Sequence, residues 1–280
     1  MASEHTIYVS SSACKNIYIN NTATRFTNRL SSPITLNSHI EYEMGLVSIL
    51  YPSQYYAIAN GDEGISIKVF IKLNHGEFKI HTHEYRCNKN ILAGDMKNII
   101  EILNEDLITE ARVYFHSHYN EYIKDNTVLY WDKNEKRTAL QYVKGTSFKN
   151  GEVMKISIKL SHKISKLLGF RSDVQYDIYG EQNNKDLIAT SIPSPSGGLE
   201  YVYVYCDIVH PSPFGGQIVN ILDCFTFENG VTKGIHNTVY KPIKTNFLDE
   251  IAIILTNQNG EGIHFSDESS VTCVLHIRPK

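Results

Sequence analysis

Apolar and polar residues alternate along much of this chain, and the alternation restricts the fold more than any other feature. Successive side chains of a β-strand point to opposite faces, so a period of two indicates a strand with one buried face. The clearest run is Ile65–Leu73, where apolar residues occupy the odd-numbered positions. The turn sequence Asn74–Gly76 follows it, and we expect Phe78 and Ile80 to continue the apolar face on the return strand.

Similar runs recur from one end of the chain to the other. Their number favours a β-sandwich or barrel. The further strands are predicted at Thr6–Val9, Asn16–Ile19, His39–Leu50, Thr127–Trp131, Thr138–Val143, Met154–Leu160, Tyr201–Val209, Gln217–Leu222, Ile251–Leu255 and Val271–Arg278.

Two segments have helical spacing instead. Apolar residues recur every three or four positions after Asp95, which can accept hydrogen bonds from free amides, and this predicts an amphipathic helix near 95–108. A second, short helix is predicted between Ser161 as its N-cap and Gly169 as a left-handed C-terminal stop. A polar stretch rich in glycine, proline and serine, Gly180–Gly198, is the best candidate for a domain boundary.

Charge and targeting signals point to no particular partner. The 280 residues include 27 basic and 30 acidic side chains, a formal net charge of −3, without a long run of either sign. This pattern gives no indication of nucleic-acid or membrane binding. We expect synthesis in the cytosol, because Met1–Ser10 has neither the basic nor the apolar region of a signal peptide. The five cysteines, an odd number without a C-x-x-C pair, are typical of a reducing compartment.

The strongest candidate for chemistry is the pair His81 and His83, with a second pair at His116 and His118. Residues i and i+2 of a strand share a face, so two imidazoles could bind one metal ion, as in cupin enzymes. However, His81 and His83 continue the predicted solvent face, and the cupin spacing is absent. We therefore expect surface histidines, with no metal, no cofactor and no catalytic residues, and the familiar hydrolase, phosphate-binding and dinucleotide-binding motifs are also missing.

Tyrosines make one predicted strand apolar on both faces. Tyr201, Tyr203 and Tyr205 alternate with valines and a cysteine. Such a strand must be covered on both sides. The tyrosine face is a candidate subunit contact, and the alternative is a cover supplied by the same chain.

A series of short motifs, in this order and spacing, resembles the minor capsid (penton) proteins of Polinton/Maverick elements and adintoviruses, to which virophage pentons are related. The motifs are Asn20–Ala23, Phe26–Leu30, Pro33–Leu36, Tyr42–Leu46, Ile49–Pro52, Ile91–Asp95, Leu168–Phe170, Tyr203–Val209, Gly216–Val219, Tyr240–Ile243, Glu250–Ile253, Gly260–Phe265 and Val274–Arg278. Two departures are Ile277, where the family more often has phenylalanine, and the segment after Gly216, which lacks an expected arginine.

The resemblance implies a mainly β, jelly-roll protein of the virion that forms homopentamers at the fivefold vertices of an icosahedral capsid. Its neighbours would be trimers of a double jelly-roll major capsid protein. Together with the strand count, the resemblance predicts a jelly-roll capsid domain made of residues 1–56 and 197–280, and an inserted or elaborated β-rich region at 57–196 that carries the helix. The chain would then be a structural protein and not an enzyme.

Two other functions remain open from the residues alone. One is a cupin-like metal-dependent enzyme, which would use the histidine pairs. The other is a ligand-binding or glycan-binding jelly roll, since exposed tyrosines can stack on sugars.

Overall fold

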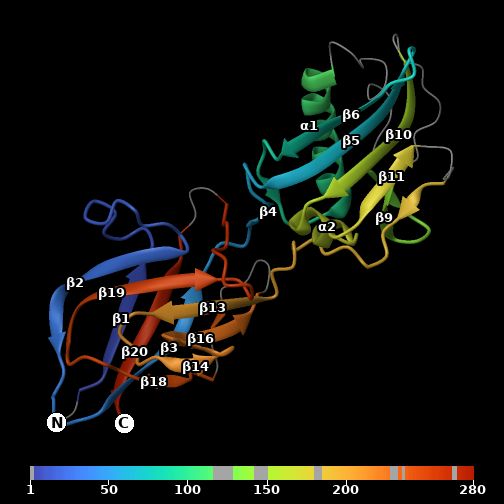
Figure 1. Cartoon of the computed structure of the whole chain (residues 1–280). Helices are drawn as coiled ribbons and strands as arrows, with labels where there is room; N and C mark the ends of the chain where they lie inside the picture. The colour runs from blue at the N-terminus through green and yellow to red at the C-terminus, as the bar shows by residue number, and fades with distance from the viewer. Residues whose placement is uncertain are drawn as a thin grey trace. The chain divides into compact units, whose positions relative to one another are not determined.

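The computed structural model describes residues 3–115, 129–141, 151–179, 185–227, 233–234, 237–266 and 270–280. The chain divides into two compact units (Figure 1). The end unit combines Met1–Tyr55 with Leu199–Lys280, and the middle unit is Tyr56–Gly198. The assignment of the end unit as a capsid domain stays a prediction.

The end unit consists of two antiparallel sheets. One has the order β1-β20-β3-β17, with β18 also paired to β3, and the other has the order β16-β13-β19-β2. A further two-stranded hairpin is formed by β14 and β15. The strands are β1 (His5–Ser10), β2 (Arg25–Thr35), β3 (Tyr42–Leu50), β13 (Tyr201–Cys206), β14 (Ser212–Phe214), β15 (Gln217–Val219), β16 (Ile221–Thr226), β17 (Lys233–Gly234), β18 (Tyr240–Pro242), β19 (Phe247–Thr256) and β20 (Thr272–Pro279).

The alternation in the sequence builds the core between these two sheets. Every second residue of β20 is buried, and so is every second residue of β13. Cys206 of β13 and Cys273 of β20 both lie in this core, where burial raises the pKa of each thiol. The first and last strands of the unit pair directly, with His5 opposite Ile277. The fold class predicted from the sequence, a jelly-roll sandwich with a middle region carrying an amphipathic helix, is confirmed.

The middle unit has its own sheets and its own core. A four-stranded sheet has the order β11-β10-β5-β6, a three-stranded sheet the order β12-β9-β8, and β4 pairs with β7. The elements are β4 (Tyr56–Ile58), β5 (Glu63–Leu73), β6 (Phe78–Arg86), β7 (Ile91–Leu92), α1 (Met96–Phe115), β8 (Leu129–Asp132), β9 (Arg137–Leu140), β10 (Gly151–Leu160), α2 (His162–Leu168), β11 (Gln175–Tyr179) and β12 (Leu187–Ile188).

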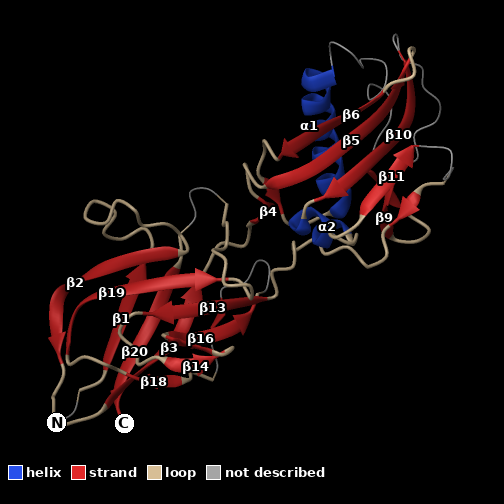
Figure 2. Cartoon of the chain, viewed as in Figure 1, coloured by secondary structure: helices blue, strands red, loops and turns tan. Residues whose placement is uncertain are grey.

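Both helices pack on one face of the four-stranded sheet (Figure 2). The apolar side of α1 buries Ile99 and Leu103 in the same cluster as the inward residues of β5 and β10. The hydroxyl oxygen of Ser161 caps α2 by accepting from the Ile164 amide, and Gly169 ends the helix with φ 80°. Both helix ends were predicted from the sequence. The first helix is longer than predicted, because it continues to Phe115.

Two predictions about local structure are wrong. Asn16–Ile19 is not a strand: Cys14 has φ 56°, and its carbonyl accepts from the Ile17 and Tyr18 amides, which makes turns. In the β5–β6 hairpin, Phe78 does not continue the apolar face, since it pairs with Lys72. The predicted strand ends Thr127 and Val143 lie outside the described residues.

Candidate interaction surfaces

The register of the β5–β6 hairpin places His81 and His83 on the inner face of the four-stranded sheet, which packs on the core of the middle unit. His81 pairs with Val69 and His83 with Ile67, both of which are buried. The two histidines are therefore half-buried on the face that the helices cover, and the prediction that they lie on the solvent face is wrong. Phe78 and Ile80 take the outer face, where they are 69% and 62% exposed.

Neither histidine belongs to a group of metal-binding side chains. Within the described ranges, no three histidine, cysteine, aspartate or glutamate side chains gather closely enough to hold a metal ion. The second pair, His116 and His118, lies outside those ranges. The structure thus gives the cupin-like interpretation no support from His81 and His83.

The tyrosine face of β13 is partly covered by the same chain. Phe214 of the β14–β15 hairpin meets Tyr203 edge to face, with 5.1 Å between the ring centroids. Tyr205 is half-buried, whereas Tyr201 remains 44% exposed. The opposite side of β13, Val202 and Val204, is buried in the sandwich. Of the three predicted contact residues, Tyr201 has the side chain that is most clearly accessible to a neighbouring subunit.

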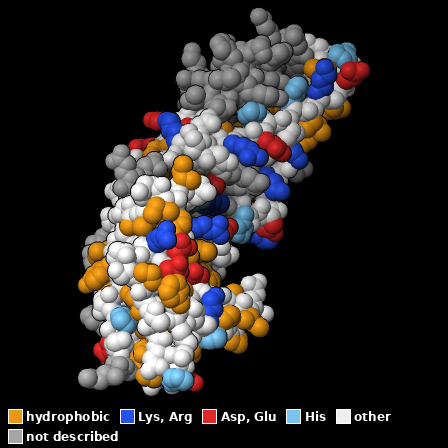
Figure 3. Space-filling view, turned by 90° about the vertical axis from the view of Figure 1, so that its left-hand side faces the viewer, with side chains coloured by type: hydrophobic (Ala, Val, Ile, Leu, Met, Phe, Trp, Pro, Cys, Tyr) orange, Lys and Arg blue, Asp and Glu red, His pale blue; other side chains and the backbone are white. Residues whose placement is uncertain are grey.

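Large apolar side chains are exposed on β1 and on the loop that follows it. We call Tyr8, Ile17 and Ile19 the N-terminal patch; they are 72%, 53% and 89% exposed. The loop is held in place, since Tyr18 donates a hydrogen bond to the Glu250 carboxylate and thereby has its pKa raised to about 12. Figure 3 shows hydrophobic side chains (orange) at the surface on the side of the molecule that carries this loop.

A second exposed apolar region lies on the β14–β15 hairpin. Pro213 and Ile218 face each other across the two strands on the side away from Tyr203, and we call them the hairpin patch. Ile218 is 77% exposed. The turn is formed by Gly215 and Gly216, both with positive φ, as a two-residue type I′ hairpin requires. Within the end unit, this hairpin and the loop after β1 lie well apart (Figure 1).

Sequence analysis did not identify either patch as an interaction surface. Ile17 and Ile19 fit the alternating pattern, so they were predicted to lie in a strand. Ile218 was predicted in a single strand, Gln217–Leu222, which the structure divides into β15 and β16. The Gly215-Gly216 pair was a signal for a hairpin, but it does not indicate which face of that hairpin is covered.

The carboxylate of Asp223, in the end unit, is enclosed in a way that disfavours its charged form. Asp223 lies on β16 opposite Val204, and its Oδ1 accepts from the Cys224 amide. Its Oδ2 is enclosed, and among the described residues no hydrogen-bond donor reaches it. Burial raises the pKa of Asp223 above its usual value, with Lys241 and the Cys224 amide opposing the shift.

Asp223→Asn is expected to stabilise the end unit at neutral pH. A raised carboxyl pKa means that the folded state binds the proton more tightly than the unfolded state does. The contribution of Asp223 to the free energy of unfolding is therefore most favourable at low pH and is lost as the pH rises through the folded-state pKa. The amide of asparagine carries no charge to bury, so the variant is expected to be more stable than the wild type by about 1 kcal/mol at pH 7. Thermal melts at pH 7 and at about pH 3.5, below the usual pKa of an aspartate, should show the gain shrinking at the lower pH. A gain of equal size at both pH values would contradict this explanation, and Asp249→Asn, on the exposed part of β19, is the control.

The fold and its exposed surfaces define a class: a jelly-roll β protein whose two chain ends form the sandwich, with a helix-bearing unit between them and apolar patches on the sandwich surface. No helix in the described part of the chain is long and apolar enough to cross a membrane.

Comparison with known proteins finds similarity among solved structures. No family model and no curated protein matches the sequence. Among solved structures, the penton protein of mavirus is similar over 99% of this chain and 100% of that chain, with 10% sequence identity and a TM-score of 0.47. Similarity of this degree leaves the function to be argued from the residues of the chain itself.

Proposed function

We propose that this protein is a structural capsid protein of the virion, a penton that assembles as a homopentamer at the fivefold vertices of an icosahedral shell. Its neighbours there would be copies of a double jelly-roll major capsid protein. The stoichiometry and the neighbours follow from the family resemblance of the sequence motifs. The Polinton/Maverick and adintovirus affiliation has the same basis.

The observation that carries the proposal is the presence of two separate apolar patches on one jelly-roll unit. Subunits in a ring contact each other head to tail, so each copy must present two different surfaces. The N-terminal patch and the hairpin patch are separate and mainly aliphatic, and Ile19 and Ile218 are among the most exposed apolar side chains of the described residues. Ile17 and Ile19 lie in one loop and Ile218 faces Pro213 across the hairpin, so these are not the isolated exposed apolar residues that need no explanation.

The edges of the sheets support a self-limiting assembly. β1 is an edge strand of its sheet and β2 an edge strand of the other. The side chain of Asn28 on β2 bonds to both backbone groups of Ser10 on β1, at 2.6 Å and 2.8 Å, and so joins the two edges. An edge held in this way is protected against unwanted strand addition. The apolar patches are then the surfaces left for association.

The oligomeric mass of the full chain tests the proposal. Native mass spectrometry is expected to give a particle of five 31.9 kDa chains. Ile19→Glu and Ile218→Glu should each convert it to monomers, because either variant places a charge in one half of the repeated contact. Ile192→Glu is the matched control, since Ile192 is 80% exposed but belongs to the middle unit. A monomeric or dimeric wild type would overturn the proposal.

A further inference from the structure

The outer face of the four-stranded sheet in the middle unit is an exposed surface that could bind a ligand. Its inner face is covered by α1 and α2. On the outer face the described side chains are exposed or half-buried, apart from Ser157, and the register places them in cross-strand rows. Lys159, Ser66 and Glu84 form one row. Asp177, Ser157, Lys68 and Thr82 form the next row, in which the Ser157 hydroxyl donates to the Asp177 carboxylate.

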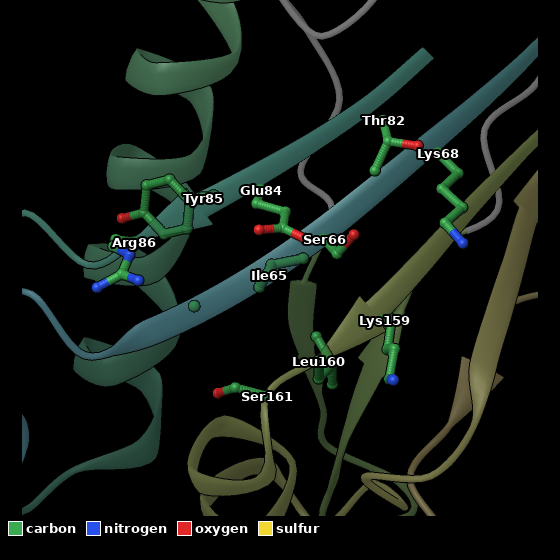
Figure 4. A pocket seen from close by; sticks show the side chains of 11 residues that line it. Ile65, Ser66, Lys68, Thr82, Glu84, Tyr85, Arg86, Lys159, Leu160 and Ser161 are labelled. Atoms are coloured by element: carbon green, nitrogen blue, oxygen red, sulfur yellow. The ribbon is translucent and has the colours of Figure 1, made fainter. Parts of the chain in front are cut away.

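A hollow of about 500 Å³ opens over these rows (Figure 4). This volume lies within the range of about 300–1,000 Å³ that is usual for sites that bind small ligands. Lys68 extends from β5 and Lys159 from β10, and their side chains lie on the same side of the sheet in the close-up (Figure 4). Because they occupy diagonal cross-strand positions, both ammonium groups can reach one ligand.

The two lysines differ from a neighbouring lysine of the same sheet. Lys155 is neutralised by Asp177, with 2.7 Å between Nζ and Oδ2, and it also lies over the Phe70 ring. No carboxylate among the described side chains lies within ion-pair distance of Lys68 or Lys159. Glu84 lies on the same face but forms no ion pair with Lys68 or Lys159, so two adjacent ammonium groups remain available to an anionic ligand.

The other groups in the hollow narrow the chemistry of that ligand. Ser66 and Thr82 contribute hydroxyls, which donate and accept, and Glu84 contributes a carboxylate, which only accepts. A carboxylate beside the cations repels a continuous chain of phosphates but accepts hydrogen bonds from sugar hydroxyls. Phe78 and Ile80 add exposed apolar surface further along the same face, against which the apolar side of a sugar ring can pack.

We propose that this face, centred on Lys68, Lys159 and Glu84, binds an acidic saccharide, with the two lysines holding its sulfate or carboxylate group and Glu84 accepting from its hydroxyls. The site would give the protein a glycan-binding activity in addition to its structural role. It lies wholly in the middle unit and does not depend on the number of subunits in the assembly.

The test measures binding of the full-length protein to a sulfated tetrasaccharide, a sialylated trisaccharide and an uncharged oligosaccharide of matched length by titration calorimetry. At least one acidic probe should bind, and the uncharged one should not. The double variant Lys68→Gln/Lys159→Gln should weaken binding by about tenfold or more. Lys97→Gln, an exposed lysine of α1 on the opposite side of the sheet, is the matched control and should leave binding unchanged.

Direct comparison with a single-stranded oligonucleotide separates a sugar from a nucleic acid. The continuous phosphates of the oligonucleotide are repelled by the Glu84 carboxylate, so it should bind more weakly than the acidic saccharides, whose hydroxyls can donate to that carboxylate. The proposal is overturned if neither acidic saccharide binds, if the double lysine variant binds as the wild type does, or if the oligonucleotide binds more tightly than both saccharides. Thermal melts of each variant establish that the loss is not caused by unfolding.

Discussion

Leu275→Asp is expected to unfold the end unit while the middle unit keeps its structure. Leu275 lies on β20, is completely buried, and is flanked by β1 on one side and β3 on the other. An aspartate there would be a buried charge without a partner. Its cost, about 5 kcal/mol or more, equals much of the usual stability of a domain. We expect unfolding to be confined to the end unit, because the core of the middle unit is a separate cluster of side chains.

Hydrogen exchange and fluorescence can follow the two units separately. The variant should lose amide protection in β3, β19 and β20 and keep it in α1 and β10. The single tryptophan of the chain, Trp131, is in the middle unit and packs on its core, so its unfolding transition should stay in place. Val274→Asp is the matched control: the neighbouring side chain points to the other face and is half-buried, so a smaller loss is expected. Loss of protection in both units together would contradict independent cores.

The fold class could be predicted because burial on one face leaves a direct trace in the sequence. In β20 and in β19 from Glu250 to Leu255, buried residues alternate with exposed or half-buried ones. The strands predicted there, Val271–Arg278 and Ile251–Leu255, fall within the observed strands apart from Val271. The second helix could be predicted because Ser161 and Gly169 act locally: one caps free amides and the other adopts a left-handed conformation. Such signals need no knowledge of the rest of the chain.

The surfaces could not be predicted because they depend on long-range pairing. A shift of one residue in a hairpin exchanges the two faces of the returning strand. The sequence around Asn74–Gly76 does not fix that register. The bond from the Leu73 amide to the Glu77 carbonyl does, and it places His81 inside and Ile80 outside. The rows that bring Lys68 beside Lys159 likewise require the pairing of β5 with β10, which are separated by most of the middle unit.

Asn104→Leu is expected to destabilise the middle unit by about 3 kcal/mol. Asn104 lies on the buried side of α1, and its side chain bonds to both backbone groups of Leu129: its Nδ2 donates to the carbonyl at 2.7 Å, and its Oδ1 accepts from the amide at 3.0 Å. Leu129 is fully buried, so water cannot replace either bond. Leucine fills a similar volume but leaves a buried donor and a buried acceptor without partners, and each costs about 1–3 kcal/mol.

Denaturant unfolding followed by Trp131 fluorescence measures this loss directly, because Trp131 and Leu129 lie on the same strand, β8. Asn98→Leu is the matched control: it makes the same substitution on the exposed side of α1 and should change stability by about 0.5 kcal/mol or less. An Asn104→Leu variant as stable as the control would mean that the two bonds do not tie α1 to β8.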